Sequence, residues 1–256
     1  MTFHRYVALG DSFTAGVGDP DPGRPNGVRG WADRAAAVLA TQTDEFGYAN
    51  LAIRGRKLRA VLDEQIEPAL ALEPDLVTIY AGANDIMRPS VDIDGLVAEY
   101  DAALGQVVSA GAHLVVFTAF DPGGFPVFGT MRGRFAVYNE LVREVAECHR
   151  ATLVDFWRMR EYRVPGMWAD DRMHMSSAGH QWMAMAVLDA LGVDHDLVPL
   201  DLTPAPRLTK QERRAANLEW ARTHAAPWVK RRLTGQSSGD ALDPRYPTLD
   251  RPDRRL

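Results

Sequence analysis

The sequence RYVALGDSF, residues 5–13, joins an apolar run to a polar turn and is the stretch that decides the fold class. RYVAL suits a buried strand, and Gly10 followed by Asp11 and Ser12 ends it. Four similar runs recur along the chain, at residues 48–52 (YANLA), 75–81 (DLVTIYA), 113–119 (HLVVFTA) and 152–156 (TLVDF). We therefore predict five buried strands.

Helical patterns separate these runs, and their alternation predicts how the layers are built. They cover residues 31–39, 58–72, 94–110, 134–149 and 176–191, and we expect Pro68 to restart a helix. Strands that alternate with helices form a parallel sheet covered on both faces, which explains why the strands are apolar throughout. The sequence thus predicts an α/β protein, a three-layer α/β/α sandwich.

The last part of the chain differs in composition from the rest. Of the 29 Lys and Arg residues, 12 lie from residue 207 onward with only 6 of the 34 Asp and Glu, so residues 1–206 carry an excess of 11 negative charges. We expect residues 209–233 to be helical and interrupted at Pro227, and residues 235–256 to wrap the surface or stay disordered. A basic tail can contact nucleic acid or membrane. Because this one contains apolar anchors (Trp220, Trp228 and Leu233), docking on the acidic body is the favoured interpretation.

Composition and missing motifs narrow the function classes. The chain has 46% hydrophobic residues and no apolar run near the ~20 residues of a membrane span. No leader pattern precedes the first strand, so we expect a cytoplasmic protein. The one cysteine, Cys148, excludes an intrachain disulfide and is expected to be buried. Only three lysines occur, and the phosphate-binding, dinucleotide-binding and Ser/Lys nucleophile motifs are absent.

Polar residues follow the predicted strands at the sheet edge where ligands bind in parallel α/β folds. Ser12 follows the first strand, and Asp171 and His174 come after the fifth. A serine hydroxyl needs a base within hydrogen-bond reach and a group that orients that base. We therefore assign Ser12 as nucleophile, His174 as its base and Asp171 as the orienting acid, since a spacing of three residues can bring carboxylate and imidazole together.

The oxyanion formed in such a reaction needs donors already in place. We expect three: the Ser12 N–H at a helix N-terminus, the Gly55 N–H and the Asn84 side-chain amide. Each residue alone is more commonly a turn or capping residue, and their joint occurrence carries the argument. A metal site built on His174, His180 and an aspartate lacks the close spacing of zinc motifs, so we expect no metal, and His180 is expected to have a helix-packing or capping role. We expect no cofactor either.

Four blocks in this order resemble the GDSL-type esterases and lipases, also called SGNH hydrolases, over about residues 5–192. Gly10-Asp11-Ser12 matches with Phe13 in place of leucine, the block from Gly82 to Asp85 matches fully, and Asp171-x-x-His174 matches with Met175 where proline is common. The four residues of the family name correspond to Ser12, Gly55, Asn84 and His174. The resemblance implies a flavodoxin-like, five-stranded parallel sheet of order 2-1-3-4-5, a catalytic triad, a three-donor oxyanion hole and no metal.

The expected activity is cleavage of ester-type acyl bonds through an acyl-enzyme, as in a carboxylesterase or lipase. The expected partner is a small-molecule acyl ester, with no nucleic acid. Residues 1–195 would form the hydrolase domain and residues 196–256 the extension. Loops 120–130 and 162–169, which contain Phe125, Phe128, Met167 and Trp168, could wall an acyl pocket. Two alternatives stay open: an acyltransferase with the same triad, and a non-catalytic ligand-binding scaffold.

Overall fold

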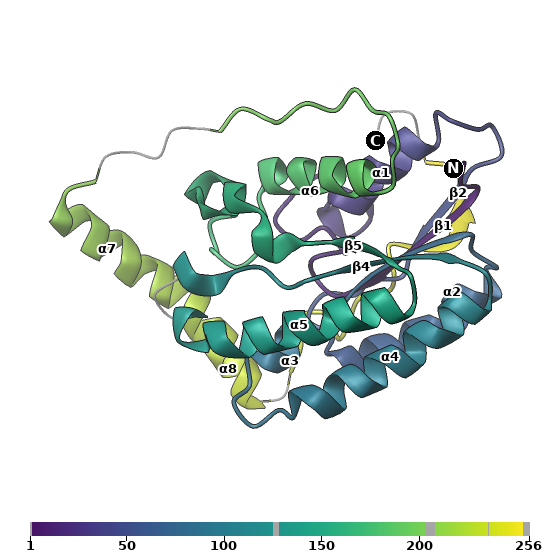
Figure 1. Cartoon of the computed structure of the whole chain (residues 1–256). Helices are drawn as coiled ribbons and strands as arrows, with labels where there is room; N and C mark the ends of the chain where they lie inside the picture. The colour runs from purple at the N-terminus through teal and green to yellow at the C-terminus, as the bar shows by residue number, and fades with distance from the viewer. Residues whose placement is uncertain (1, 125–127, 203–207, 235, 253–256) are drawn as a thin grey trace.

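The protein is a three-layer sandwich with a sheet between two layers of helices (Figure 1), as the sequence predicts. The computed structural model describes residues 2–124, 128–202, 208–234 and 236–252. Helices α1 (Trp31–Leu39) and α6 (Ser177–Ala190) cover one face. Helices α2 (Leu58–Ala71), α4 (Ile93–Ser109) and α5 (Arg132–Cys148) cover the other face.

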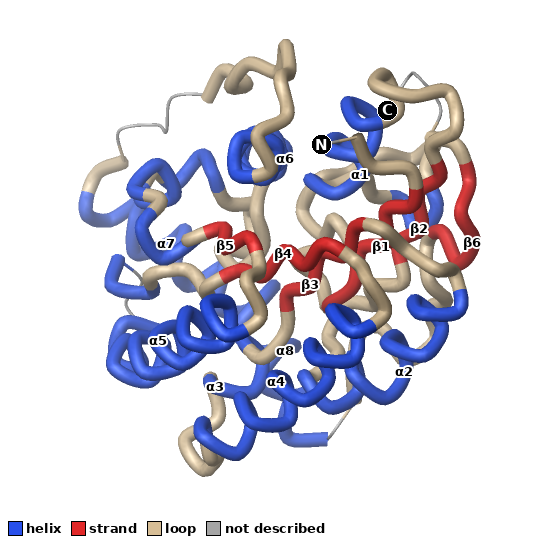
Figure 2. Tube along the Cα trace, turned by 45° about the vertical axis from the view of Figure 1, so that its right-hand side comes forward, coloured by secondary structure: helices blue, strands red, loops and turns tan. Residues whose placement is uncertain are grey.

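The sheet holds six strands in the order β5-β4-β3-β1-β2-β6 (Figure 2). The first five pair in parallel and have the predicted order 2-1-3-4-5; they are β1 (Arg5–Gly10), β2 (Gly47–Asn50), β3 (Leu76–Tyr80), β4 (His113–Phe117) and β5 (Thr152–Val154). The sixth, β6 (Tyr246–Asp250), pairs antiparallel with β2. The sheet therefore has one strand more than the five expected, because part of the segment expected to wrap the surface or stay disordered pairs with β2 at the edge of the sheet.

Apolar packing on both faces explains why these runs become strands. Every residue of β3 is buried, and β1 is buried from Tyr6 onward. Phe13, which stands where the family more often has leucine, packs its ring against those of Trp31, Tyr80 and Phe117. The residue after Ser12 is therefore held by the aromatic core, which restrains the turn that carries the serine.

Two local expectations were wrong. Helix α2 continues through Pro68 instead of restarting there, because Pro68 is exposed and the carbonyl that loses its partner can be hydrated. Cys148, the last residue of α5, is exposed and not buried as expected. The last helix of the core, α6, begins where the sequence predicts. Ser176 caps it by accepting a hydrogen bond from the Gly179 N–H at 3.2 Å.

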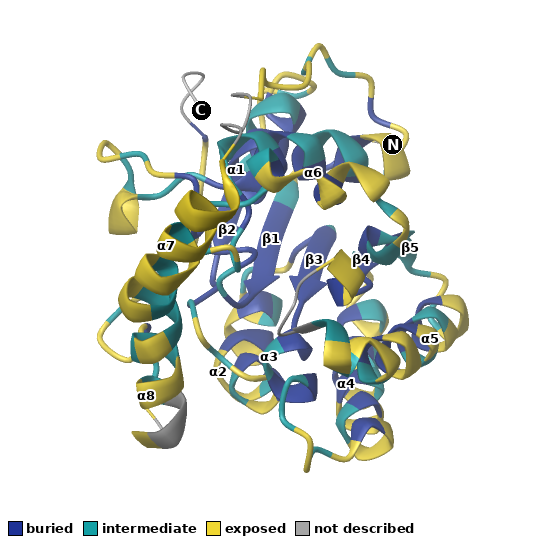
Figure 3. Cartoon of the chain, turned by 90° about the vertical axis from the view of Figure 1, so that its left-hand side faces the viewer, coloured by how far each residue is buried: buried dark blue, intermediate teal, exposed yellow. Residues whose placement is uncertain are grey.

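The extension contains two helices in one line, α7 (Lys210–Trp220) and α8 (Ala226–Thr234), joined by a π-helical turn at Ala221–Ala225 (Figure 3). A capping box of Thr209 and Glu212 begins α7. The remaining described elements are short: α3 (Ala83–Ile86) and six 3₁₀ turns at Pro25–Gly27, Pro122–Gly124, Phe128–Met131, Phe156–Arg158, Arg160–Arg163 and Pro165–Met167. Within the described ranges, no helix combines the length and apolar character needed to cross a bilayer.

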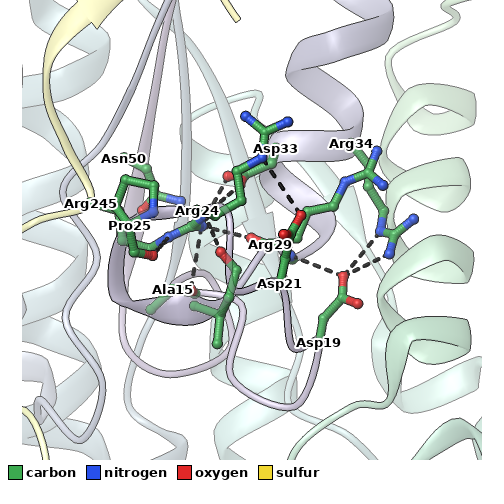
Figure 4. Close-up of polar contacts among 12 residues, drawn as sticks. Ala15, Asp19, Asp21, Arg24, Pro25, Arg29, Asp33, Arg34, Asn50 and Arg245 are labelled. Atoms are coloured by element: carbon green, nitrogen blue, oxygen red, sulfur yellow. Dashed lines mark hydrogen bonds and ion pairs between the residues drawn. The ribbon is translucent and has the colours of Figure 1, made fainter. Parts of the chain in front are cut away.

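A buried arginine ties the extension to the body just before β6 (Figure 4). Arg245 donates to both carboxylate oxygens of Asp33 on α1, at 3.0 and 2.5 Å, and both side chains are fully buried. The same guanidinium donates to the carbonyls of Ala15 and Arg29. Ala15 belongs to the turn that follows Ser12, so the extension contacts the segment that carries the candidate nucleophile.

Candidate active site

Ser12 lies in a series of turns after β1 and not at the start of a helix, which corrects the sequence expectation. The Ala15 N–H donates to the Asp11 carbonyl at 2.9 Å, and the Val17 N–H donates to the Ser12 carbonyl at 3.1 Å. Gly16 and Gly18 have φ of +85° and +101°, which helical residues do not adopt, so the chain curls into turns. The Ser12 hydroxyl is left partly exposed at the carboxyl edge of the sheet.

Asp171 and His174 are joined by a short turn. His174 Nδ1 lies 2.6 Å from Asp171 Oδ2, and the N–H groups of Met173 and His174 donate to Oδ1 at 2.9 and 3.0 Å. Arg172 closes the turn with φ of +55°. Burial raises the pKa of Asp171, but the hydrogen bonds and charge of His174 outweigh burial and hold that pKa below its usual value. Asp171 is thus a carboxylate that accepts from the ring.

Ser12 and His174 line the same two neighbouring cavities. Among the described residues, no hydrogen bond joins the Ser12 hydroxyl to the His174 ring. Catalytic hydrogen bonds are often long in ligand-free enzymes and tighten when substrate binds. The structure therefore brings the three residues of the expected triad to one place, with the Asp171–His174 pair formed and the Ser12–His174 pair open.

Two backbone donors belong to residues that line the larger of these two cavities, whose volume is about 320 Å³. Neither the Ser12 N–H nor the Gly55 N–H donates to another group in the part of the chain that the structure describes, and both residues line this cavity. Gly55 has φ of +78°, and a Cβ there would lie 2.3 Å from Ser237 Oγ. Glycine is required at this position for its backbone conformation and for the approach of the extension.

The third expected donor, Asn84, is already hydrogen-bonded. Its Nδ2 donates to Asp11 Oδ2 at 2.8 Å and to the Arg56 carbonyl at 3.1 Å. One of these bonds would have to be given up or shared for the amide to donate to an oxyanion, the role expected from the sequence. Burial raises the pKa of Asp11 to about 7. The charge of Asp11, and with it the strength of the hydrogen bond from Asn84, therefore changes near neutral pH.

Sequence reasoning included two carboxylates in the matched blocks but assigned neither of them a role in supporting the site. Asp11 accepts from the Phe13 N–H at 3.0 Å as well as from Asn84, and Asp85 accepts from the Leu58 N–H at 2.9 Å. Asp85 thereby caps the first turn of α2, which follows the Gly55 loop. Both residues stand next to motif residues in the chain, and that adjacency was the signal that could have found them.

The extension also forms hydrogen bonds with two loops of the site, the Asp171–His174 turn and the Arg54–Gly55 loop. The sequence did not indicate these contacts. Trp220 Nε1 donates to the Asp171 carbonyl at 3.0 Å, and Arg172 donates to Asn217 at 2.8 Å with its guanidinium over the Trp220 ring. On the other side, Ser237 Oγ donates to the Arg54 carbonyl at 3.3 Å. The expected anchor Trp228 lines both cavities, whereas the side chain of Leu233, also expected as an anchor, lies outside the described residues.

The two cavities differ in size and chemistry. The smaller, of about 90 Å³, is walled by aromatic and sulfur-containing side chains that include Phe120 and Trp168 from the two expected loops. The larger, of about 320 Å³, is polar. Of the other residues expected at the acyl wall, Met167 is buried behind it, while Phe125 and the side chain of Phe128 lie outside the described residues.

His180 belongs to the core and not to the site. Its Nδ1 accepts from the Trp31 N–H and its Nε2 lies against the Val17 carbonyl, both at 3.1 Å. Burial lowers its pKa to about 4, so the ring is neutral. Over the ranges that are described, no three His, Cys, Asp or Glu side chains are arranged to hold a metal ion.

Known proteins share this architecture. An acetylxylan esterase of Geobacillus stearothermophilus is 28% identical over 213 residues, which cover 74% of this chain and 94% of that protein. The crystal structure of LAE5, an alpha/beta hydrolase enzyme from the metagenome of Lake Arreo, Spain, aligns with a TM-score of 0.62 and 26% identity over 74% of this chain and 95% of that one. A catalytic mutant of Axe2, an acetylxylan esterase from Geobacillus stearothermophilus, shares the fold with a TM-score of 0.62 at 24% identity, over 76% of this chain and 98% of that one. Residues 8–182 match the sequence profile of the GDSL-like lipase/acylhydrolase family, and this chain belongs to that family.

Proposed function

We propose that this protein hydrolyses esters of short acyl groups, with Ser12 as nucleophile, His174 as general base and Asp171 orienting the ring. Family membership and the acetylxylan esterase relative identify it as an ester-cleaving serine hydrolase. The roles of individual residues and the size of the acyl group are the proposal. The observation that carries it is the 2.6 Å contact between Asp171 and His174 at the wall of a cavity that Ser12 also lines.

The reaction follows from this geometry in two stages. His174 Nε2 takes the proton as Ser12 Oγ attacks the acyl carbon, and the negative charge on the former carbonyl oxygen is stabilised by the Ser12 and Gly55 N–H groups and the Asn84 amide. Collapse expels the alcohol, which receives the proton from His174. Water then attacks the acyl-enzyme by the same route and releases the acid. Asp171 remains a carboxylate and stabilises the charged ring.

The smaller cavity supports a short acyl group. Its volume of about 90 Å³ is well below the ~300–1,000 Å³ of pockets that enclose whole drug-sized molecules. Its apolar walls suit an acetyl or similarly short chain, in keeping with the name of the acetylxylan esterase relative. Acyl transfer to an alcohol would use the same acyl-enzyme, but no observation favours it. A cytoplasmic location stays a prediction.

We also propose that residues 1–195 form the hydrolase domain and residues 196–256 an extension docked on it. The support is the set of contacts at three places: Trp220 with Asp171, Ser237 with Arg54, and Arg245 with Asp33. These bonds link the extension to α1, to the Arg54–Gly55 loop and to the Asp171–His174 turn, and Arg245 also donates to the Ala15 carbonyl in the turn after Ser12.

Labelling with a fluorophosphonate tests the nucleophile. We expect stoichiometric labelling at Ser12, found by peptide mass spectrometry, and loss of both labelling and turnover of p-nitrophenyl acetate in Ser12→Ala. The exposed Ser90 provides a matched control, because Ser90→Ala removes the same hydroxyl outside the site. Labelling at another residue, or Ser12→Ala with substantial activity and an unchanged melting temperature, would refute the assignment.

A further inference from the structure

The larger cavity lies beside the candidate triad and is built from both parts of the chain. Ser12, Gly55, Asn84 and His174 line it from the body. The opposite wall comes from the π-helical turn, from α8 and from the segment after it: Thr223, His224, Pro227, Trp228, Arg231, Gln236, Ser237 and Ser238. Whatever occupies this cavity contacts the reacting serine on one side and the extension on the other.

Positive charge dominates this cavity in a protein whose body is acidic. Arg54, Lys57, Arg88 and Arg231 line it, and among the described residues of the lining the one carboxylate is Asp171, which His174 already engages. Within the described ranges none of these four cations forms an ion pair, whereas the neighbouring Arg56, outside the lining, pairs with Glu64 and Asp240. We call Arg54, Lys57, Arg88 and Arg231 the cationic wall.

The cationic wall holds the like charges of Arg54 and Arg231 close together, and Asp171, whose charge acts on Arg54 in the opposite sense, already pairs with His174. Arg54 is half-buried, and its burial together with the charge of Arg231 lowers its pKa. Its Nε reaches only the Ser238 hydroxyl, at 3.1 Å. Arg88 Nε is buried and has no hydrogen-bond partner in the part of the chain that is described. A buried donor without a partner is unfavourable, and a bound anion would satisfy it.

We propose that the cationic wall binds an anionic group on the alcohol part of the ester, so that the preferred substrates are short acyl esters of alcohols that carry a carboxylate or phosphate. The small apolar cavity takes the acyl group, which leaves the larger polar cavity for the alcohol. Guanidinium groups bind both anions through paired N–H donors. This inference rests on the proposed function, because it assigns the two sides of the scissile ester to the two cavities.

Two matched esters test the charge preference: meta-carboxyphenyl acetate and its neutral amide isostere, meta-carbamoylphenyl acetate. We expect kcat/KM to be higher for the carboxylate by about tenfold, the effect of one charged hydrogen bond. High salt should reduce the ratio of kcat/KM for the carboxylate ester to kcat/KM for the amide ester, because the wall is open to solvent. Equal values for the two esters, or a lower value for the carboxylate, would overturn the proposal.

Substitutions locate the preference on the wall. We expect the ratio to fall toward one in the Arg54→Gln/Arg231→Gln variant and to be retained in Arg214→Gln, which removes the same charge from an exposed position on α7. Lys57→Gln, at an exposed position with no bond to lose, should lower the ratio in part even if the double variant folds poorly. A ratio unchanged in both wall variants, or lowered equally in Arg214→Gln, would refute the assignment.

Binding separates this inference from the proposed mechanism. Calorimetric titration of Ser12→Ala should show benzoate or phenyl phosphate binding more tightly than benzamide, and the tighter of the two anions indicates the preferred group. Binding of benzamide as tight as that of both anions would overturn the cationic wall while leaving the nucleophile assignment intact. Conversely, failure of Ser12 labelling would refute the mechanism regardless of how tightly benzoate and phenyl phosphate bind.

Discussion

The buried pair of Arg245 and Asp33 makes a quantitative prediction about the extension. Arg245→Met keeps most of the side-chain volume but leaves Asp33 without its cation in a fully buried site. Breaking a buried ion pair by removing one partner lowers the free energy of unfolding by about 3–5 kcal/mol. The carbonyls of Ala15 and Arg29 would also lose a donor. We therefore expect a loss in the upper part of that range.

The loss should depend on pH, with a sign that the structure determines. Burial raises the pKa of Asp33, and Arg245 opposes that rise. Without Arg245 the pKa of Asp33 rises further, so the variant is least destabilised near the ordinary aspartate value of ~3.9 and loses stability as pH rises from there. The difference between wild type and variant should therefore shrink as pH falls from neutral toward 5.

Urea unfolding followed by circular dichroism measures both effects. With m near ~3 kcal/mol/M for a chain of this size, the midpoint should fall by about 1–2 M at neutral pH. Asp33→Asn in the Arg245→Met background should recover part of the loss, because it removes the unpaired charge. Arg251→Met is the control: its partner Asp44 is exposed, so we expect a loss of at most ~1 kcal/mol. A loss from Arg245→Met no larger than the control's would refute the reasoning.

Three further predictions concern the site. Asn84→Ala should lower kcat by ~10²-fold with little change in KM, because the amide acts on the oxyanion of the transition state; a change confined to KM in steady-state kinetics would contradict this role. Gly55→Ala should lower both activity and melting temperature, since a Cβ there meets Ser237 Oγ at 2.3 Å and φ is +78°; wild-type values of both would show that the loop adapts. Burial raises the pKa of Asp11 from 3.8 to about 7, so its ionisation removes stability as pH rises across that window. Asp11→Asn should therefore flatten the pH dependence of urea unfolding between about 4 and 7, and an unchanged slope would argue against a buried, protonatable Asp11.

Local patterns were sufficient to predict the framework of the core. Apolar runs of strand length alternating with helical periodicity determine a parallel sheet with two covered faces, because such strands have no polar face to expose to water. The contact between Asp171 and His174 could equally be predicted from the sequence, since both residues lie in one turn and their contact depends on a spacing of three residues. The order of the first five strands came with the family resemblance.

Tertiary structure decided what depends on contacts between distant residues. β6 pairs with a strand about 200 residues earlier, and Arg245 binds Asp33 across 212 positions of sequence. The periodicity of a short stretch of sequence therefore cannot predict either contact. The bond between Asp11 and Asn84, 73 residues apart, appears only when β1 and β3 lie side by side. The cationic wall draws Arg54 and Arg88 from loops of the body and Arg231 from α8, and the charges of Arg54 and Arg231 oppose each other only because folding places the extension over the site. Sequence alone therefore identified the candidate residues of the site, and the packing of the extension determined the cavity that they line.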